Sequence, residues 1–179
     1  MSWPERIESA VREILAVVHE LNRYEIYSHV IPAPRPPATE HAIRQYEQRL
    51  GMRLPASYGT FLRMYNGFEW LAFPGHMLSI EDSSPGGEYW PDIKEWKLGM
   101  SDAGLAEALD GVVIAYLDQP NNWAYLDPDR SSGEELQVAL HVPGVDPDYY
   151  PDVAAFLESS AGRARLALSW CMQRSEKKV

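Results

Sequence analysis

The stretch RLGMRLPASYGTFLRMYNGFEW, residues 49–70, decides the fold class of this chain. It contains the end of one helix and then a whole second helix. Pro55 begins the second helix because proline fits the first turn, and the pair Asn66-Gly67 ends it. Only residues 52–54 separate the two helices, so their apolar faces must pack together as a helical hairpin. Nothing in the stretch has the pattern of an active site.

An amphipathic helix precedes this hairpin. Ser2 and Glu5 match a capping box, Pro4 fits the first turn, and apolar residues recur at helical spacing over about residues 3–22. The segment IPAPRPP, residues 31–37, must be extended because each proline fixes φ and disfavours helix in its predecessor. We therefore expect one domain over residues 1–179, in which this helix and a proline-rich connector are added to a core.

The pattern after the hairpin is that of strands. Strands are predicted at residues 68–73, 77–80, 112–117, 123–126 and 136–142, with a further short strand at 24–30. Residues 81–92 predict an acidic loop, residues 93–98 fit strand or helix equally, and residues 103–109 predict a short helix. A last helix begins at Pro151 and ends before a charged tail. This order indicates an α+β fold with a mainly antiparallel sheet flanked by helices.

The charge of the chain restricts its partners. Its 26 acidic and 16 basic residues give a formal net charge of -10, which opposes binding to nucleic acid or to an anionic membrane and attracts a basic protein. The single cysteine, Cys171, cannot form an internal disulfide, and the charged start lacks the apolar segment of a signal peptide. We therefore expect a cytoplasmic protein.

No cofactor or metal site is expected. The five histidines are scattered. The run Asp146-Pro-Asp148-Tyr-Tyr-Pro-Asp152 has Pro151 and Leu157 where a calcium loop needs glycine and glutamate, so a turn that caps the last helix explains it better. Ser57 stands at a helix start and not in a nucleophile elbow. No phosphate-binding glycine loop occurs. These observations predict a protein that is not an enzyme.

The acidic loop is the candidate partner-binding surface. Aromatic side chains ringed by polar residues are typical of interface hot spots, although the same aromatic residues could instead pin the loop onto the domain. The candidate residues are Glu81, Asp82, Glu88, Tyr89, Trp90 and Asp92, joined by Asp118 and Asp129.

The hairpin motif resembles the signature of the SUKH superfamily, which is typified by the yeast cell-wall-assembly and killer-toxin-resistance regulator. The matching residues are Leu54-Pro55-x-x-Tyr58-x-x-Phe61-Leu62-x-x-x-Asn66-Gly67, and a later strand that ends in Leu126-Asp127 fits the same family. The resemblance covers roughly residues 32–168. The first helix, the connector and the acidic insertion after Ile80 depart from the family pattern. In physical terms the motif residues are structural.

The resemblance implies a function as a bacterial immunity protein, which binds and neutralises a cognate toxin domain without turnover. An acidic inhibitor of this kind suits a toxin with a basic cleft, such as a nuclease. The alternative is a non-enzymatic regulatory scaffold that binds cellular proteins, as eukaryotic family members do. The sequence leaves the oligomeric state open.

Overall fold

The computed structural model describes residues 1–24, 27, 31–102, 110–117 and 122–176. The predicted strand at 24–30, for the most part, and the predicted helix at 103–109 lie outside the described residues. The helices described are α1 (Trp3–Leu21), α2 (Glu40–Leu50), α3 (Ala56–Met64), α4 (Trp90–Asp102) and α6 (Val153–Glu176). The strands are β1 (Ala33–Pro34), β2 (Phe68–Glu69), β3 (Gly75–Met77), β4 (Val112–Leu117), β5 (Trp123–Ser132), β6 (Glu135–His141) and β7 (Asp148–Tyr150).

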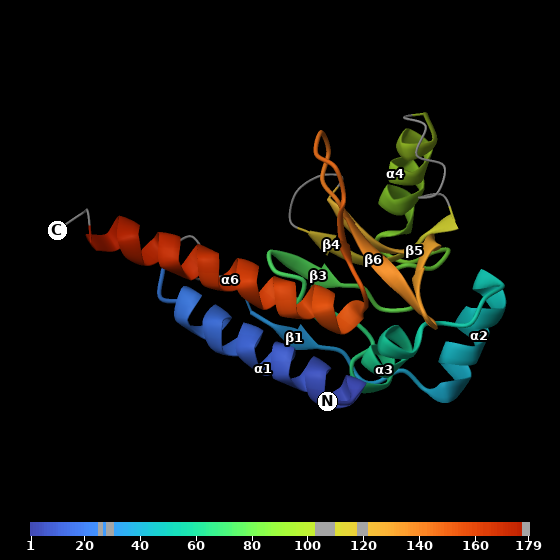
Figure 1. Cartoon of the computed structure of the whole chain (residues 1–179), viewed down its shortest axis with the longest axis horizontal. Coiled ribbons are helices and arrows are strands. Elements are labelled where there is room, and N and C mark those ends of the chain that lie inside the picture. Colours follow the sequence, from blue (N-terminus) through green and yellow to red (C-terminus); the bar gives the residue numbers. More distant parts are fainter. Residues whose placement is uncertain (25–26, 28–30, 103–109, 118–121, 177–179) are drawn as a thin grey trace.

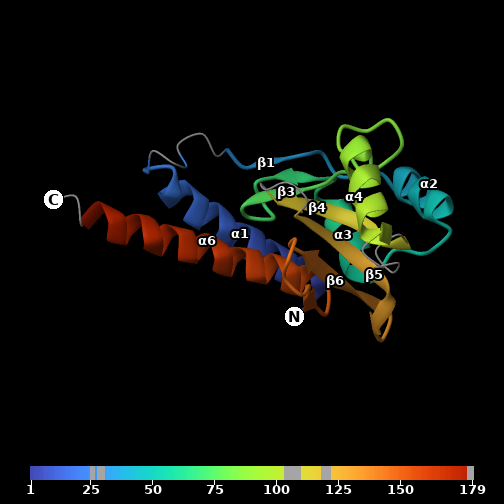
Figure 2. The same cartoon turned by 90° about the horizontal axis from the view of Figure 1, so that it is seen from above.

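The strands form one antiparallel sheet, in which the spatial order follows the order along the chain from β1 to β7. This result confirms the expected α+β fold. The helices lie on both sides of the sheet: α1, α3 and α6 cover one face and α4 covers the other (Figures 1 and 2).

The alternation of side chains along β5 explains how one sheet serves two hydrophobic clusters. Ala124 and Leu126 contribute to the large cluster under α1, α3 and α6, whereas Trp123 and Tyr125 contribute to a smaller aromatic cluster under α4. Successive strand residues point to opposite faces, so a strand buried on both sides must be apolar at every position. The segment WAYL has this composition.

The first and last helices pack side by side, which Figures 1 and 2 both show. The guanidinium of Arg6 in α1 donates to the carboxylates of Asp152 at 3.1 Å and Glu158 at 2.9 Å. The hydrogen bond with Glu158, more than that with Asp152, raises the pKa of Arg6. Asp152 also accepts from the Ala155 N–H at 2.8 Å, so the predicted cap of the last helix is confirmed.

Several predicted strand boundaries are wrong. The strand predicted at 68–73 ends at Glu69, because Trp70 has a φ of +61°, which a strand cannot continue. The strand predicted at 77–80 instead covers Gly75–Met77. The strand predicted at 123–126 is too short, since β5 continues to Ser132 before the chain reverses.

Two further elements differ from the predictions. The acidic segment 81–92 is not a loop throughout, because α4 begins at Trp90 and Pro91 fits its first turn. The same helix settles the ambiguity at residues 93–98. Residues predicted as a turn before the last helix contain β7, an edge strand that pairs with β6.

Candidate protein-binding surface

The acidic loop, residues 81–89, is fixed to the connector through one buried carboxylate. Asp82 is only 6% exposed, and it accepts hydrogen bonds from the Ser79 N–H at 3.0 Å and from Arg35 at 3.1 Å. In return the Asp82 N–H donates to the Ser79 hydroxyl at 3.0 Å. Arg35 belongs to the proline-rich connector, so a segment of the chain far away in sequence holds this loop in place.

The end of α3 holds the loop from another side. The Asn66 side chain accepts from the Ile80 N–H at 3.0 Å and donates to Glu81 at 2.7 Å. Gly67 has a φ of +92°, and a Cβ at this position would lie 2.8 Å from the Ser79 nitrogen. The pair Asn66-Gly67 therefore follows the end of α3 and also holds the start of the acidic loop, through hydrogen bonds of Asn66 and close packing of Gly67 against Ser79.

Helix α2 makes the third attachment. The Tyr46 hydroxyl is hydrogen-bonded to the Ser83 hydroxyl at 3.1 Å, and Arg49 donates to the Ser84 hydroxyl. Ser83 and Ser84 are both buried. With three separate elements bonded to it, the loop presents its remaining carboxylates in a defined geometry.

The carboxylates predicted to bind a partner fall into two groups. Glu81, Glu88 and Asp92 are exposed, whereas Asp82 is internal and belongs to the support of the loop. Asp129 is exposed on β5, and its N–H donates to Asp127 at 2.9 Å. Asp118 lies outside the described residues. We call the exposed carboxylates Glu81, Glu88 and Asp92, with the adjacent Tyr89 and Trp90, the acidic surface.

The two aromatic residues of the acidic surface are half-buried. Tyr89 packs against Tyr116 and Trp123, with ring centroids 5.5 and 6.4 Å away. Burial raises the pKa of Tyr89 to about 12, with a further contribution from the negative charge of Glu88. Trp90 is half-buried at the first residue of α4. These side chains keep apolar area accessible between charged neighbours, which is the composition of a hot spot.

Sequence reasoning missed one carboxylate in this region. A small pit of about 70 Å³ is lined by Glu69, Glu88 and Tyr89 together with Arg35 and Asp82. Glu69 is exposed at the end of β2, and only the folded chain brings it to the acidic surface. The sequence around Glu69 does not indicate a role in binding, because single exposed carboxylates on strands are common.

Trp96 has a different role from Trp90. It is 4% exposed in the cluster under α4, and its indole N–H donates to the His141 Nδ1 at 3.3 Å. The Lys97 ammonium donates to the Gly111 carbonyl at 2.8 Å, and burial lowers the pKa of this lysine. Both contacts attach α4 to the sheet, so Trp96 pins the helix.

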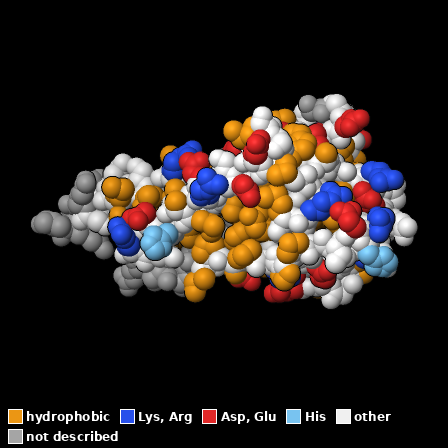
Figure 3. Space-filling model, turned by 90° about the horizontal axis from the view of Figure 1, so that it is seen from below, with side chains coloured by type: hydrophobic (Ala, Val, Ile, Leu, Met, Phe, Trp, Pro, Cys, Tyr) orange, Lys and Arg blue, Asp and Glu red, His pale blue; other side chains and the backbone are white. Residues whose placement is uncertain are grey.

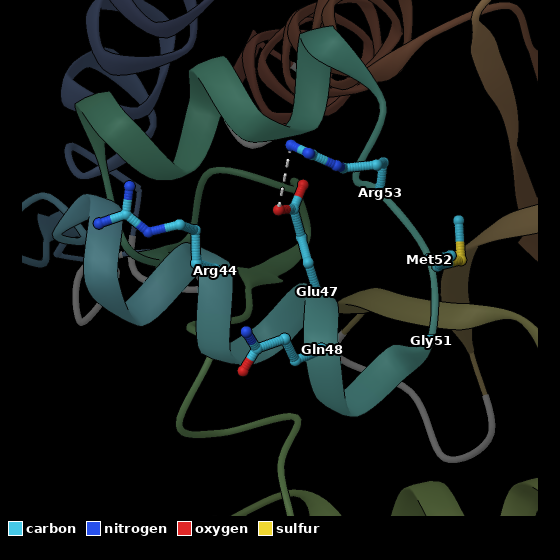
Figure 4. A pocket seen from close by; sticks show the side chains of 6 residues that line it. All are labelled: Arg44, Glu47, Gln48, Gly51, Met52 and Arg53. Atoms are coloured by element: carbon cyan, nitrogen blue, oxygen red, sulfur yellow. Dashed lines mark ion pairs between the residues drawn. The ribbon is translucent and has the colours of Figure 1, made fainter.

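A hollow of about 370 Å³ lies beside the hairpin, between α2 and the loop that follows it (Figure 4). Glu47 points toward Arg53, 3.9 Å away, and also accepts from the Leu54 N–H at 3.0 Å. Arg44 lines the same hollow, so its cations outnumber its carboxylate. This balance does not suit a basic partner.

The helical side of the molecule also lacks a concentration of acid. In Figure 3 a band of hydrophobic side chains crosses the middle of this face, and acidic and basic side chains are mixed around it. Across the described part of the chain, no group of histidine, cysteine or carboxylate side chains could hold a metal ion. Likewise, none of the described helices is long and apolar enough to cross a membrane.

The profile of the SMI1 / KNR4 family (SUKH-1) matches residues 37–159. The chain belongs to this family. The match begins at the end of the connector and stops inside α6, so it is shorter at both ends than the sequence resemblance suggested. Helix α1 lies outside it. No curated protein sequence matches the chain significantly.

The family motif of this SUKH-1 chain is structural in the folded protein. Tyr58, Phe61 and Leu62 of α3 are fully buried in the large cluster, and Pro55 stands at the N-cap of that helix. Leu54 packs against the same cluster, and Leu126 is buried in it from β5. Asp127 is also buried, and its Oδ1 accepts the hydrogen bond from Asp129 described above. The motif therefore specifies the fold and supports the acidic surface.

Proposed function

We propose that this SUKH-1 protein is an immunity protein, which neutralises a cognate bacterial toxin domain by stoichiometric binding without turnover. The observation that carries the proposal is the acidic surface: exposed carboxylates and half-buried aromatic residues on the first turn of α4 and on a loop that three other elements hold in place. A basic partner, such as a nuclease toxin, has the complementary charge. Family membership and the net charge of -10 agree with this proposal.

The two kinds of side chain contribute differently to binding. Glu81, Glu88 and Asp92 attract a basic partner over a distance of about 10 Å at moderate ionic strength and so raise the association rate. Tyr89 and Trp90 lose the rest of their exposure on contact, which slows dissociation. Because the loop is already attached to α2, α3 and the connector, little conformational entropy is lost on binding.

A co-expression experiment tests the function. A candidate toxin domain, chosen from the products of neighbouring genes, is produced in cells with and without this protein. The proposal predicts survival only with the protein, together with a one-to-one complex on purification. Cells that die despite soluble protein, or survival without a complex, would contradict it, and would favour a regulatory scaffold that binds other cellular proteins.

Trp90 tests the location of the interface. Trp90→Ala is expected to weaken binding to the toxin domain by about 2 kcal/mol or more, as truncation of an interfacial tryptophan does. Leu98→Ala is the matched control, because Leu98 is 66% exposed on the same helix and is not part of the acidic surface. Equal affinities of the two variants in calorimetric titrations would remove Trp90 from the interface.

A further inference from the structure

An open groove lies beside α4, lined by residues of this helix that follow the acidic surface in the chain. It has a volume of about 620 Å³, and its walls are one side of α4 and the loop between β6 and β7. Its apolar lining includes Trp96, Met100 and Val145, with Pro143 and Pro147 at the ends of the loop. The groove is larger than a single side chain needs and lies within the range of protein binding sites.

The loop wall presents apolar area to solvent in a preformed turn. The Val145 N–H donates to the Val142 carbonyl at 3.2 Å, and the two prolines restrict the backbone on either side. Val145 is nevertheless 65% exposed. The exposed side chain of Val145 therefore adds apolar area to this wall of the groove, beside Pro143 and Pro147.

Gly99 of α4 lines the groove on the side formed by the helix. Glycine is the least favourable helix residue after proline. A Cβ at Gly99 would meet no other atom within 4 Å, so the packing of this chain does not require glycine at that position. Because Gly99 has no side chain, the groove is open at this position, and the backbone of a bound segment can approach α4 closely.

The charge of the rim selects the occupant. Glu95 on α4 and Asp146 on the loop both line the groove, and no lysine or arginine is among the described residues that line it. The Lys97 ammonium is directed to the Gly111 carbonyl, as described above. A segment with positive charge is therefore favoured over a neutral or acidic one.

We propose that this groove binds a polypeptide segment in which a large apolar side chain is flanked by lysine or arginine. The apolar side chain lies against Trp96, Met100 and Val145, and the cationic side chains pair with Glu95 and Asp146. The groove shares no residue with the acidic surface, and the proposal holds whether the partner is a toxin or another protein.

Selection from a phage-displayed library of random short peptides against the intact protein tests the proposal. We expect enriched peptides to combine an aromatic or aliphatic residue with lysine or arginine. Their affinity, measured by fluorescence polarisation, should fall at least about tenfold in Gly99→Gln, which fills the groove, and in Val145→Asn, which removes apolar area without adding charge. It should also fall in Glu95→Gln/Asp146→Asn, mostly at low ionic strength.

Two controls separate a binding role from a structural one. Gly99→Gln replaces glycine by a better helix former, so its denaturation midpoint should be unchanged or higher while binding is lost. Leu98→Gln removes apolar area from α4 outside the groove and should change the affinity less than about twofold. Failure to enrich any peptide, enrichment of acidic peptides, or binding that survives in Gly99→Gln would each overturn the proposal.

Discussion

Glu135 shows how one buried side chain joins three elements. Its carboxylate accepts from the Ser57 N–H at 3.1 Å and from the Ser57 hydroxyl at 2.5 Å, at the N-terminus of α3. The same hydroxyl accepts from the Val153 N–H at 3.3 Å, at the start of α6. The first residue of β6 thus supplies the cap that Pro55, without a side-chain acceptor, cannot supply.

Removal of this carboxylate should be costly. Glu135→Ala leaves the buried polar groups of Ser57 without an acceptor, and we expect a loss of about 2–3 kcal/mol in the free energy of unfolding. Glu134→Ala is the matched control at an exposed neighbouring position, with an expected change within about 0.5 kcal/mol. Urea denaturation measures both. Equal stability of the two variants would show that the contact with Ser57 contributes nothing.

Tyr89 gives a pH-dependent signature of the acidic surface. Its pKa is raised from 10 to about 12 in the folded protein, chiefly by burial. Between these pH values the unfolded chain loses the proton that the folded chain keeps, so the stabilisation is complete below pH 10 and is lost as pH rises toward 12. Tyr89→Phe should therefore reduce the loss of stability over this interval.

Ultraviolet titration of tyrosine absorbance checks this assignment. The difference between the wild type and Tyr89→Phe should show one group that ionises near pH 12. In Glu88→Gln the same group should ionise at lower pH, but still above 10, because burial remains the larger cause. A difference curve centred at pH 10 would contradict the packing of Tyr89 against Tyr116 and Trp123.

The environment of single residues could be predicted only where it does not depend on contacts with residues far away in the sequence. The exposure of Glu81, Glu88 and Asp92 follows from their charge alone. The burial of Asp82 does not, because it depends on Arg35, 47 residues earlier in the chain. The groove beside α4 was missed for the same reason, since its two walls come from segments about as far apart.

Among the elements, the central strands and the hairpin were the most predictable. The strand β4 matches the predicted range 112–117, because its apolar run is buried on both faces. Helix α3 was expected from Pro55 and Asn66-Gly67 and is confirmed within a residue or two at each end. The strands β1 and β7 are too short to show an alternation of apolar and polar residues. They are recognised only by their pairing with β2 and β6.

The turn that supports the acidic surface has a glycine, Gly87, at a position with no room for a side chain. A Cβ at Gly87 would lie 2.0 Å from the Glu81 carbonyl oxygen and 2.6 Å from that of Asp82. Gly87→Ala should therefore lower the free energy of unfolding by about 1–3 kcal/mol, as overpacking does. Chemical denaturation provides the measurement, and amide exchange at residues 81–89 should rise.

Gly99→Ala is the matched variant in open space. Because nothing lies within 4 Å of the new Cβ and alanine favours helix, its free energy of unfolding should rise by up to about 1 kcal/mol. If Gly87→Ala were as stable as the wild type, the close packing of the acidic loop against its own backbone would be wrong.

At the scale of the whole molecule, the two faces of the sheet have different roles. The face under α1, α3 and α6 holds the larger hydrophobic cluster, which includes the buried residues of the family motif. The other face holds the smaller aromatic cluster, and above it lie α4, the acidic surface and the groove. The candidate binding residues therefore lie on a loop and a helix that the sheet holds in place. Binding residues are often found on loops that a rigid scaffold positions in this way.

The central claim is that the acidic surface recruits a basic partner. The most direct measurement is the association rate constant for the proposed cognate toxin domain, determined at increasing ionic strength for the wild type and for Glu81→Gln/Glu88→Gln/Asp92→Asn. We expect the wild-type rate to fall steeply with salt, and the variant to associate at least about tenfold more slowly at low salt and to depend less on it. Equal rates for the two proteins, or a wild-type rate that does not change with salt, would contradict the claim.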